Sequence, residues 1–189
     1  MSARFPTIPA DAYSAAQKAL AAEIAGGPRG GVRGPFLALM HHPALAARLQ
    51  ALGEHLRFGT GMPPHLVEIV VLVTARRWTC QYEWVAHERI ARKEGVPDAI
   101  IAAIAVGRRP DAMDADQALV HDVATAAHAS GELPDALFGV AEARFGRAGV
   151  LDLLALCGYY ALLAMVLNTA RPELPDGMAP PLLPKGSAA

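Results

Sequence analysis

The stretch from Glu68 to Gly95, E-I-V-V-L-V-T-A-R-R-W-T-C-Q-Y-E-W-V-A-H-E-R-I-A-R-K-E-G, carries the main signals for fold and chemistry in this 189-residue chain. Its first half is an apolar run of helical length, and its second half is a helix pattern that a glycine ends. Between them, a break near Thr79 lets a new helix begin around Cys80. The segment therefore predicts two consecutive helices, over about residues 64–78 and 80–95.

Four side chains in this stretch can move protons or act as nucleophiles: Glu68, Cys80, Glu83 and His87. The last three are spaced i, i+3 and i+7, a spacing that places them on one face of an α-helix. A glutamate at i reaches a histidine at i+4, so we expect Glu83 to hydrogen-bond His87 and to orient its ring. Because their neighbours are apolar, the four groups are expected to form a partly dry pocket with displaced pKa values.

Two of these residues have alternative interpretations. Cys80 is either a small buried hydrophobe or, at a helix N-terminus, a thiol whose ionised form the helix dipole stabilises. Glu68 interrupts an apolar run and needs a partner there, which could equally be Arg76 or Arg77.

The spacing E-x11-C-x2-E-x3-H resembles the active-site signature of the carboxymuconolactone decarboxylase and alkylhydroperoxidase D superfamily. The alkylhydroperoxidase branch has a second cysteine at the position of Glu83. The decarboxylase branch keeps a glutamate four residues before the histidine and has no CxxC pair. The segments G-P-F-L-A-L-M-H-H-P and G-Y-Y-A-L-L-A-M-V-L-N extend the resemblance over most of residues 34–170.

The resemblance implies an all-α, alkylhydroperoxidase D-like helical bundle and an enzyme that needs no cofactor. Its first implied activity is that of a lyase, decarboxylase-like, acting on a small organic acid or lactone. In that reaction His87 is the general acid or base, Glu83 orients it, Glu68 tunes the charge of the pocket and Cys80 lines it. The remaining candidates for the substrate pocket are His42, Tyr82 and Trp84.

Two other functions fit the same residues. One is a hydroperoxide reductase of peroxiredoxin type, in which Cys80 attacks the peroxide and an external thiol resolves the sulfenic acid. Cys157, the other cysteine, lies on a predicted buried helix and is interpreted as inert core. The other function is a non-catalytic protein that keeps the pocket to bind a small acid.

Helix signals along the whole chain predict a single all-α domain with decorated ends. We divide it into an N-terminal helix and Gly-rich loop (1–33), the helical domain (34–170) and a Pro-rich tail (171–189) whose end is expected to be mobile. The other expected helices have Gly, Pro or capping residues at their ends. They cover about residues 10–25, 35–40, 44–58, 98–106, 114–130, 134–146 and 148–169.

Composition excludes several classes of protein. Net charge is −1 and there is no basic run, so nucleic-acid binding is not expected. Two cysteines make no disulfide framework, and the N-terminus lacks the apolar run of a signal peptide, so the chain is expected to be cytoplasmic. No HExxH, zinc-type Cys/His spacing or G-x-S-x-G motif occurs, so neither a metal site nor an α/β-hydrolase is expected.

The segment from Leu153 to Ala170 has no charged residue and is barely long enough to span a membrane. With no second apolar span, it is better interpreted as a central helix or one packed between subunits. The helix over 44–58, with Leu45, Leu49, Leu52 and Leu56 on one face, competes for the same core. We therefore expect a symmetric homo-oligomer, a trimer or hexamer, with no membrane partner.

Overall fold

Eight α-helices make up most of residues 4–184, the part of the chain that the computed structural model describes. No strand occurs in that range, so the all-α prediction is confirmed. The helices are α1 (Ala15–Gly26), α2 (Pro35–Leu39), α3 (Pro43–Glu54), α4 (Pro64–Arg77), α5 (Gln81–Lys93), α6 (Asp98–Ala105), α7 (Ala115–Ser130) and α8 (Asp135–Ala170). Three short turns add to them: η1 (Ala10–Ala12), the π-turn η2 (His55–Gly59) and η3 (Pro175–Gly177).

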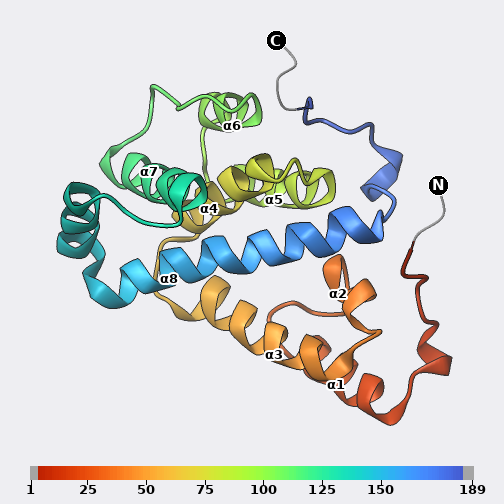
Figure 1. The fold of residues 1–189 in the computed structure, drawn as a ribbon. Coiled ribbons are helices and arrows are strands. Elements are labelled where there is room, and N and C mark those ends of the chain that lie inside the picture. Colours follow the sequence, from red (N-terminus) through yellow and green to blue (C-terminus); the bar gives the residue numbers. More distant parts are fainter. Residues whose placement is uncertain (1–3, 185–189) are drawn as a thin grey trace.

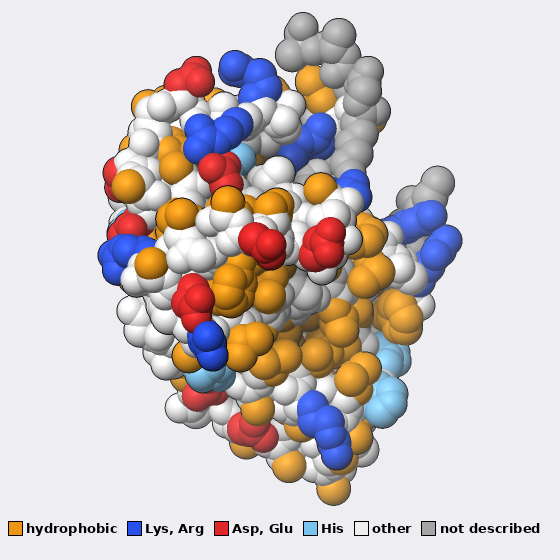
Figure 2. All heavy atoms as spheres, turned by 60° about the vertical axis from the view of Figure 1, so that its left-hand side comes forward, with side chains coloured by type: hydrophobic (Ala, Val, Ile, Leu, Met, Phe, Trp, Pro, Cys, Tyr) orange, Lys and Arg blue, Asp and Glu red, His pale blue; other side chains and the backbone are white. Residues whose placement is uncertain are grey.

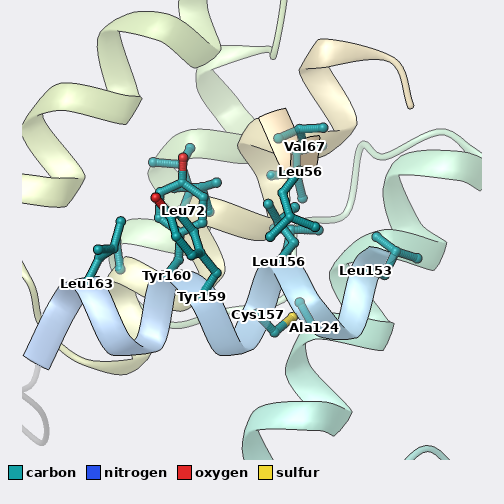
Figure 3. Packing of buried hydrophobic residues seen from close by; sticks show 14 of the residues in the cluster. Leu56, Val67, Leu72, Ala124, Leu153, Leu156, Cys157, Tyr159, Tyr160 and Leu163 are labelled. Carbon is teal, nitrogen blue, oxygen red and sulfur yellow. The ribbon is translucent and has the colours of Figure 1, made fainter. Parts of the chain in front are cut away.

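α4 and α8 form the centre of the bundle. α8 runs through the middle of the molecule, with α4, α5, α6 and α7 on one side and α1, α2 and α3 on the other (Figure 1). α4 packs against α5, α6, α7 and α8, and its residues 66–72 are all buried. A helix that is apolar all round is stable only in such a position. Tyr160 rises from α8 toward Leu72 of α4, and Leu156 rises from α8 toward Leu56 and Val67 (Figure 3).

Helix ends follow the capping residues of the sequence. Asp114 and Gln117 form the expected capping box at α7, and Gly131 ends that helix in a left-handed conformation. Gly146 (φ 69°, ψ 171°) divides α8 into two helical parts, as predicted. At the N-terminus, α1 begins later than expected, because Ser14 caps it in a box with Gln17.

The helix predicted over residues 44–58 is wrong in two respects. The α-helical part ends at Glu54 and continues as the π-turn. Its predicted apolar face is also split, because Leu49 and Leu56 are buried whereas Leu45 and Leu52 are 41% and 42% exposed. The face that packs inward instead contains small residues such as Gly53, against which the Tyr159 hydroxyl and Arg29 lie so closely that a Cβ there would overlap both.

α8 is the one helix of the described residues that is long and apolar enough to cross a membrane by length and composition. Half of its most apolar window is buried against the rest of the fold. The core helix of a soluble protein has this combination of properties, which agrees with a central helix. The last five residues of the tail, for which mobility is expected, lie outside the described residues.

An apolar face remains exposed along α3 and α8. Leu45 of α3 and Met165 of α8 line one cavity of about 490 Å³. His55, which directly follows α3, contacts Asp152 of α8 at 3.2 Å. Leu151 is 67% and Met165 48% exposed. Figure 2 shows hydrophobic side chains gathered in a broad band across one face, with most acidic and basic side chains around it.

We propose that a second copy of this chain covers this face, giving a trimer or hexamer. Residues 153–170 carry no charge, so two copies of α8 meet without like-charge repulsion, and large apolar patches are rarely left in water. Light scattering on the unmodified protein at micromolar concentration is expected to give three or six times the 19.9 kDa of one chain. A stable monomer under these conditions would contradict the proposal.

Candidate active site

A tight reversal between α4 and α5 builds the site. Thr79 adopts a left-handed conformation (φ 48°), which is unfavourable for a β-branched residue. Two hydrogen bonds hold the reversal: the Cys80 N–H donates to the Ala75 carbonyl at 2.9 Å, and the Asn168 amide of α8 donates to the Trp78 carbonyl at 2.9 Å. α5 consequently packs along α4, and residues far apart in the sequence meet.

Glu68 of α4 is the hydrogen-bond partner of His87 of α5. Glu68 Oε2 lies 2.7 Å from His87 Nδ1, and the two side chains are only 4% and 11% exposed. A carboxylate can only accept, so we assign the proton to Nδ1, which leaves Nε2 as the nitrogen able to exchange a proton with another molecule. Glu68 thus meets neither Arg76 nor Arg77, the alternative partners.

Glu83 does not orient His87, so that prediction is wrong. Neither carboxyl oxygen of Glu83 has a hydrogen-bond partner among residues 4–184, although the side chain is buried. Burial raises the pKa of Glu83 well above its ordinary value, and the nearby charge of Glu68 raises it further. Glu83 is therefore a carboxylic acid that retains its proton beside a carboxylate–imidazole pair.

Cys80 is the residue immediately before α5, as expected, but its surroundings oppose ionisation. The side chain is fully buried in a small cluster with Ala164 and Leu167. Burial raises the pKa of the thiol from 9.0 to about 12, and any negative charge on Glu83 would raise it further. The backbone N–H groups of Tyr82 and Glu83 lower this pKa, as the helix N-terminus predicts, but burial outweighs them.

One residue that sequence reasoning left out of the site borders it. The ring of Tyr160 on α8 meets the His87 ring edge-on, with 5.0 Å between centroids. Burial raises the pKa of Tyr160, and the positive charge of Arg57, in the π-turn, acts against this rise. The tyrosine pair was visible in the sequence, but nothing in the spacing connects residue 160 with residue 87. π-turns frequently occur at functional sites, and this one has no sequence signal that we recognised.

The three expected pocket residues have different positions. Tyr82 is half-buried and packs against the Cys80 cluster. Trp84 is 1% exposed and belongs to the main core. His42 does not reach the site: it is exposed, accepts the Leu45 N–H at 3.3 Å as the cap of α3, and lines the separate cavity beside Met165.

The described residues contain no group of three or more His, Cys, Asp or Glu side chains that could hold a metal ion. The chemistry available to the site is proton transfer by His87, hydrogen bonding by a neutral Glu83, and thiol chemistry at Cys80. His87, at 9% exposed, is the most accessible of the four groups, whereas Glu68 and Glu83 are each 3% exposed. A reacting molecule would therefore be small or would require local opening of the helices.

The all-α bundle has a counterpart among solved structures. A crystal structure described as an alkylhydroperoxidase AhpD core, an uncharacterized peroxidase-related protein from Ralstonia eutropha JMP134, superposes with a TM-score of 0.77. The similarity covers 93% of this chain and 94% of that one at 23% sequence identity, so it shows the fold. No curated protein sequence matches the chain.

The central part of the sequence matches a known protein family. Residues 43–129 match the Carboxymuconolactone decarboxylase family, and they include the reversal and all four residues of the buried cluster. This match covers just under half of the chain, and it supports the resemblance to the carboxymuconolactone decarboxylase and alkylhydroperoxidase D superfamily that the spacing E-x11-C-x2-E-x3-H indicated.

The raised pKa of Glu83 predicts how stability depends on pH. Above the ordinary carboxyl pKa of 4.5, the folded state holds a proton that the unfolded state has released. The free energy of unfolding therefore falls as pH rises, by up to about 1.4 kcal/mol per pH unit for one proton. Glu83→Gln removes this dependence, so urea titrations should show the variant gaining stability relative to wild type as pH rises above about 4.5.

Glu132→Gln is the matched control, because Glu132 is exposed at the end of α7. It should leave the pH dependence of wild type unchanged. If Glu83→Gln and wild type lose stability in parallel over this range, Glu83 is ionised in the folded protein and the assignment is wrong.

Proposed function

We propose that the protein is a cytoplasmic, cofactor-free lyase that decarboxylates a small organic acid or lactone by acid–base catalysis. The observation that carries the proposal is the buried 2.7 Å contact between Glu68 and His87, which fixes the ring and leaves Nε2 for the substrate. The family match over residues 43–129 supports the class of substrate, and the glutamate at position 83 matches the decarboxylase pattern.

The proposed step transfers one proton. Loss of CO2 breaks a carbon–carbon bond and leaves its electron pair on the substrate, delocalised into an adjacent carbonyl. The imidazolium form of His87 donates its Nε2 proton to that carbon, and solvent later restores the proton to the ring. Glu68 stabilises the imidazolium through Nδ1 and holds the ring in one orientation.

Glu83 acquires a different role from the one first assigned. A second ionised carboxylate beside Glu68 would repel an acidic substrate, whereas a protonated carboxyl does not. A neutral carboxyl also donates a hydrogen bond, which a carboxylate or lactone oxygen of the substrate can accept. The raised pKa of Glu83 is thus compatible with an anionic substrate beside a group that already carries negative charge.

Hydroperoxide reduction by Cys80 is the second candidate, which the description of the structural neighbour as peroxidase-related favours. The geometry is less suited to it, because burial keeps the Cys80 thiol protonated. Cys157 is poorly placed to resolve a sulfenic acid. Ala164 and Leu167, the α8 residues that cluster with Cys80, lie seven and ten positions after Cys157, which corresponds to about 10 to 15 Å along the helix.

One assay set separates the candidates. Decarboxylation of 4-carboxymuconolactone and related lactone acids, and reduction of cumene hydroperoxide with dithiothreitol, are measured for wild type, His87→Ala and Cys80→Ser. We expect His87→Ala to lower kcat for decarboxylation by about 10² to 10⁴, the usual contribution of a general acid or base, with the fold intact by circular dichroism. Cys80→Ser should retain most of this activity.

His41→Ala is the matched control, because His41 is exposed and lines the cavity beside α3. It should behave as wild type. Decarboxylation that survives His87→Ala, or peroxide reduction that disappears with Cys80→Ser while no lactone is turned over, would overturn the proposal. Binding of lactone acids without any turnover would instead support the non-catalytic alternative.

A further inference from the structure

Another cavity lies apart from the Glu68–His87 site. It is bordered by the end of α4, by α7 and by the loop that follows α6. Its volume is about 600 Å³, within the range of small-molecule sites. None of its lining residues belongs to the buried cluster of Glu68, Cys80, Glu83 and His87. Its apolar lining includes Val73, Ile104 and Val106.

Four arginines surround this apolar lining: Arg76, Arg77, Arg108 and Arg109. The whole chain has a net charge of −1, so this is a local concentration of positive charge. The carboxyl ends of α4, α6 and α7 lie nearby, and each contributes only about half a negative charge. The cavity therefore remains positive.

Asp122 is the single carboxylate that lines the cavity, and it is already paired. Its two oxygens accept from Arg109 Nε and Nη2, both at 2.8 Å, and one of them also lies 3.0 Å from His121 Nδ1. This pairing neutralises Arg109 and lowers the pKa of Asp122. The charges of the other three arginines are not balanced by this carboxylate.

Backbone carbonyls position two of these three arginines without neutralising them. Arg76 Nη1 donates to the Leu183 carbonyl at 3.0 Å, and Arg77 Nε donates to the His128 carbonyl at 3.3 Å. Gly107, in a left-handed conformation (φ 74°), turns the chain so that Arg108 follows at the rim. Residues 4–184 supply no hydrogen-bond acceptor or carboxylate for the Arg108 guanidinium in this structure.

We propose that this cavity binds an organic anion with an apolar body, whose carboxylate or phosphate group is held by Arg77 and Arg108. Guanidinium groups bind both kinds of oxyanion through paired N–H donors. The body of the ligand lies on Val73, Ile104 and Val106, because burial of apolar surface there supplies the remaining affinity. The site is independent of the proposed lyase activity.

Octanoate and octyl phosphate are suitable probes, because they distinguish a carboxylate head group from a phosphate. Binding is measured by calorimetry, and the site is located from backbone amide shifts in NMR spectra. We expect at least one of the two to bind saturably, to shift the amides of Val73, Gly107 and Thr125, and to bind more weakly as salt is raised. Octanol and inorganic phosphate, each lacking one half of the ligand, should bind more weakly.

Arg108→Ala is the main variant, and Arg48→Ala is its control, since Arg48 is exposed on α3 and bonds only a carbonyl of its own helix among the described residues. Loss of a charge-assisted hydrogen bond predicts that Arg108→Ala binds the probe at least roughly tenfold more weakly than wild type. Arg48→Ala should bind it with the affinity of wild type. Arg77→Ala, with folding checked by thermal unfolding, should behave like Arg108→Ala. No saturable binding of either probe, or equal affinity in wild type and Arg108→Ala, would overturn the proposal.

Discussion

The hydrogen bond between Glu68 and His87 is the interaction on which the site depends, and it exists only because α5 folds back along α4. Thr79 adopts an unfavourable left-handed conformation to make that reversal, and a hydrogen bond from α8 to the Trp78 carbonyl secures it. The resulting pair is almost excluded from water. Burying a carboxylate or an imidazolium without a partner is unfavourable in free energy, and here each group stabilises the charge of the other.

The same burial divides the two glutamates into different chemical states. Glu68 has the His87 ring as a partner and remains an acceptor. Glu83 has no partner among the described residues, lies near the charge of Glu68, and keeps its proton. Two carboxyl groups close together in a dry site rarely both ionise, and their separation into acceptor and donor is common in acid–base enzymes. Cys80 follows the same rule, since burial favours its neutral form.

Much of this could be predicted from the sequence, since glycines, prolines and capping residues determined most helix ends and the motif spacing identified the four clustered residues. The wrong assignment of Glu83 as the partner of His87 has a physical cause. Spacing along one helix shows which residues share a face, but a contact from a second helix can take the bond instead. The exposed Leu45 and Leu52 show the same limit, because periodicity identifies an apolar face without showing what covers it. Tyr160 and the arginine-lined cavity arise from contacts between distant segments and have no local signal.

The most direct test of the central claim is to determine which ring nitrogen of His87 carries the proton. Nitrogen-15 NMR of the ring, in wild type and in Glu68→Leu, distinguishes Nδ1–H from Nε2–H directly. If Glu68 accepts from the ring, wild type has its proton fixed on Nδ1, and Glu68→Leu, which has no acceptor, removes that preference while circular dichroism shows the fold intact. A neutral ring protonated on Nε2 alone in wild type, or a ring unaffected by Glu68→Leu in a folded variant, would contradict the account.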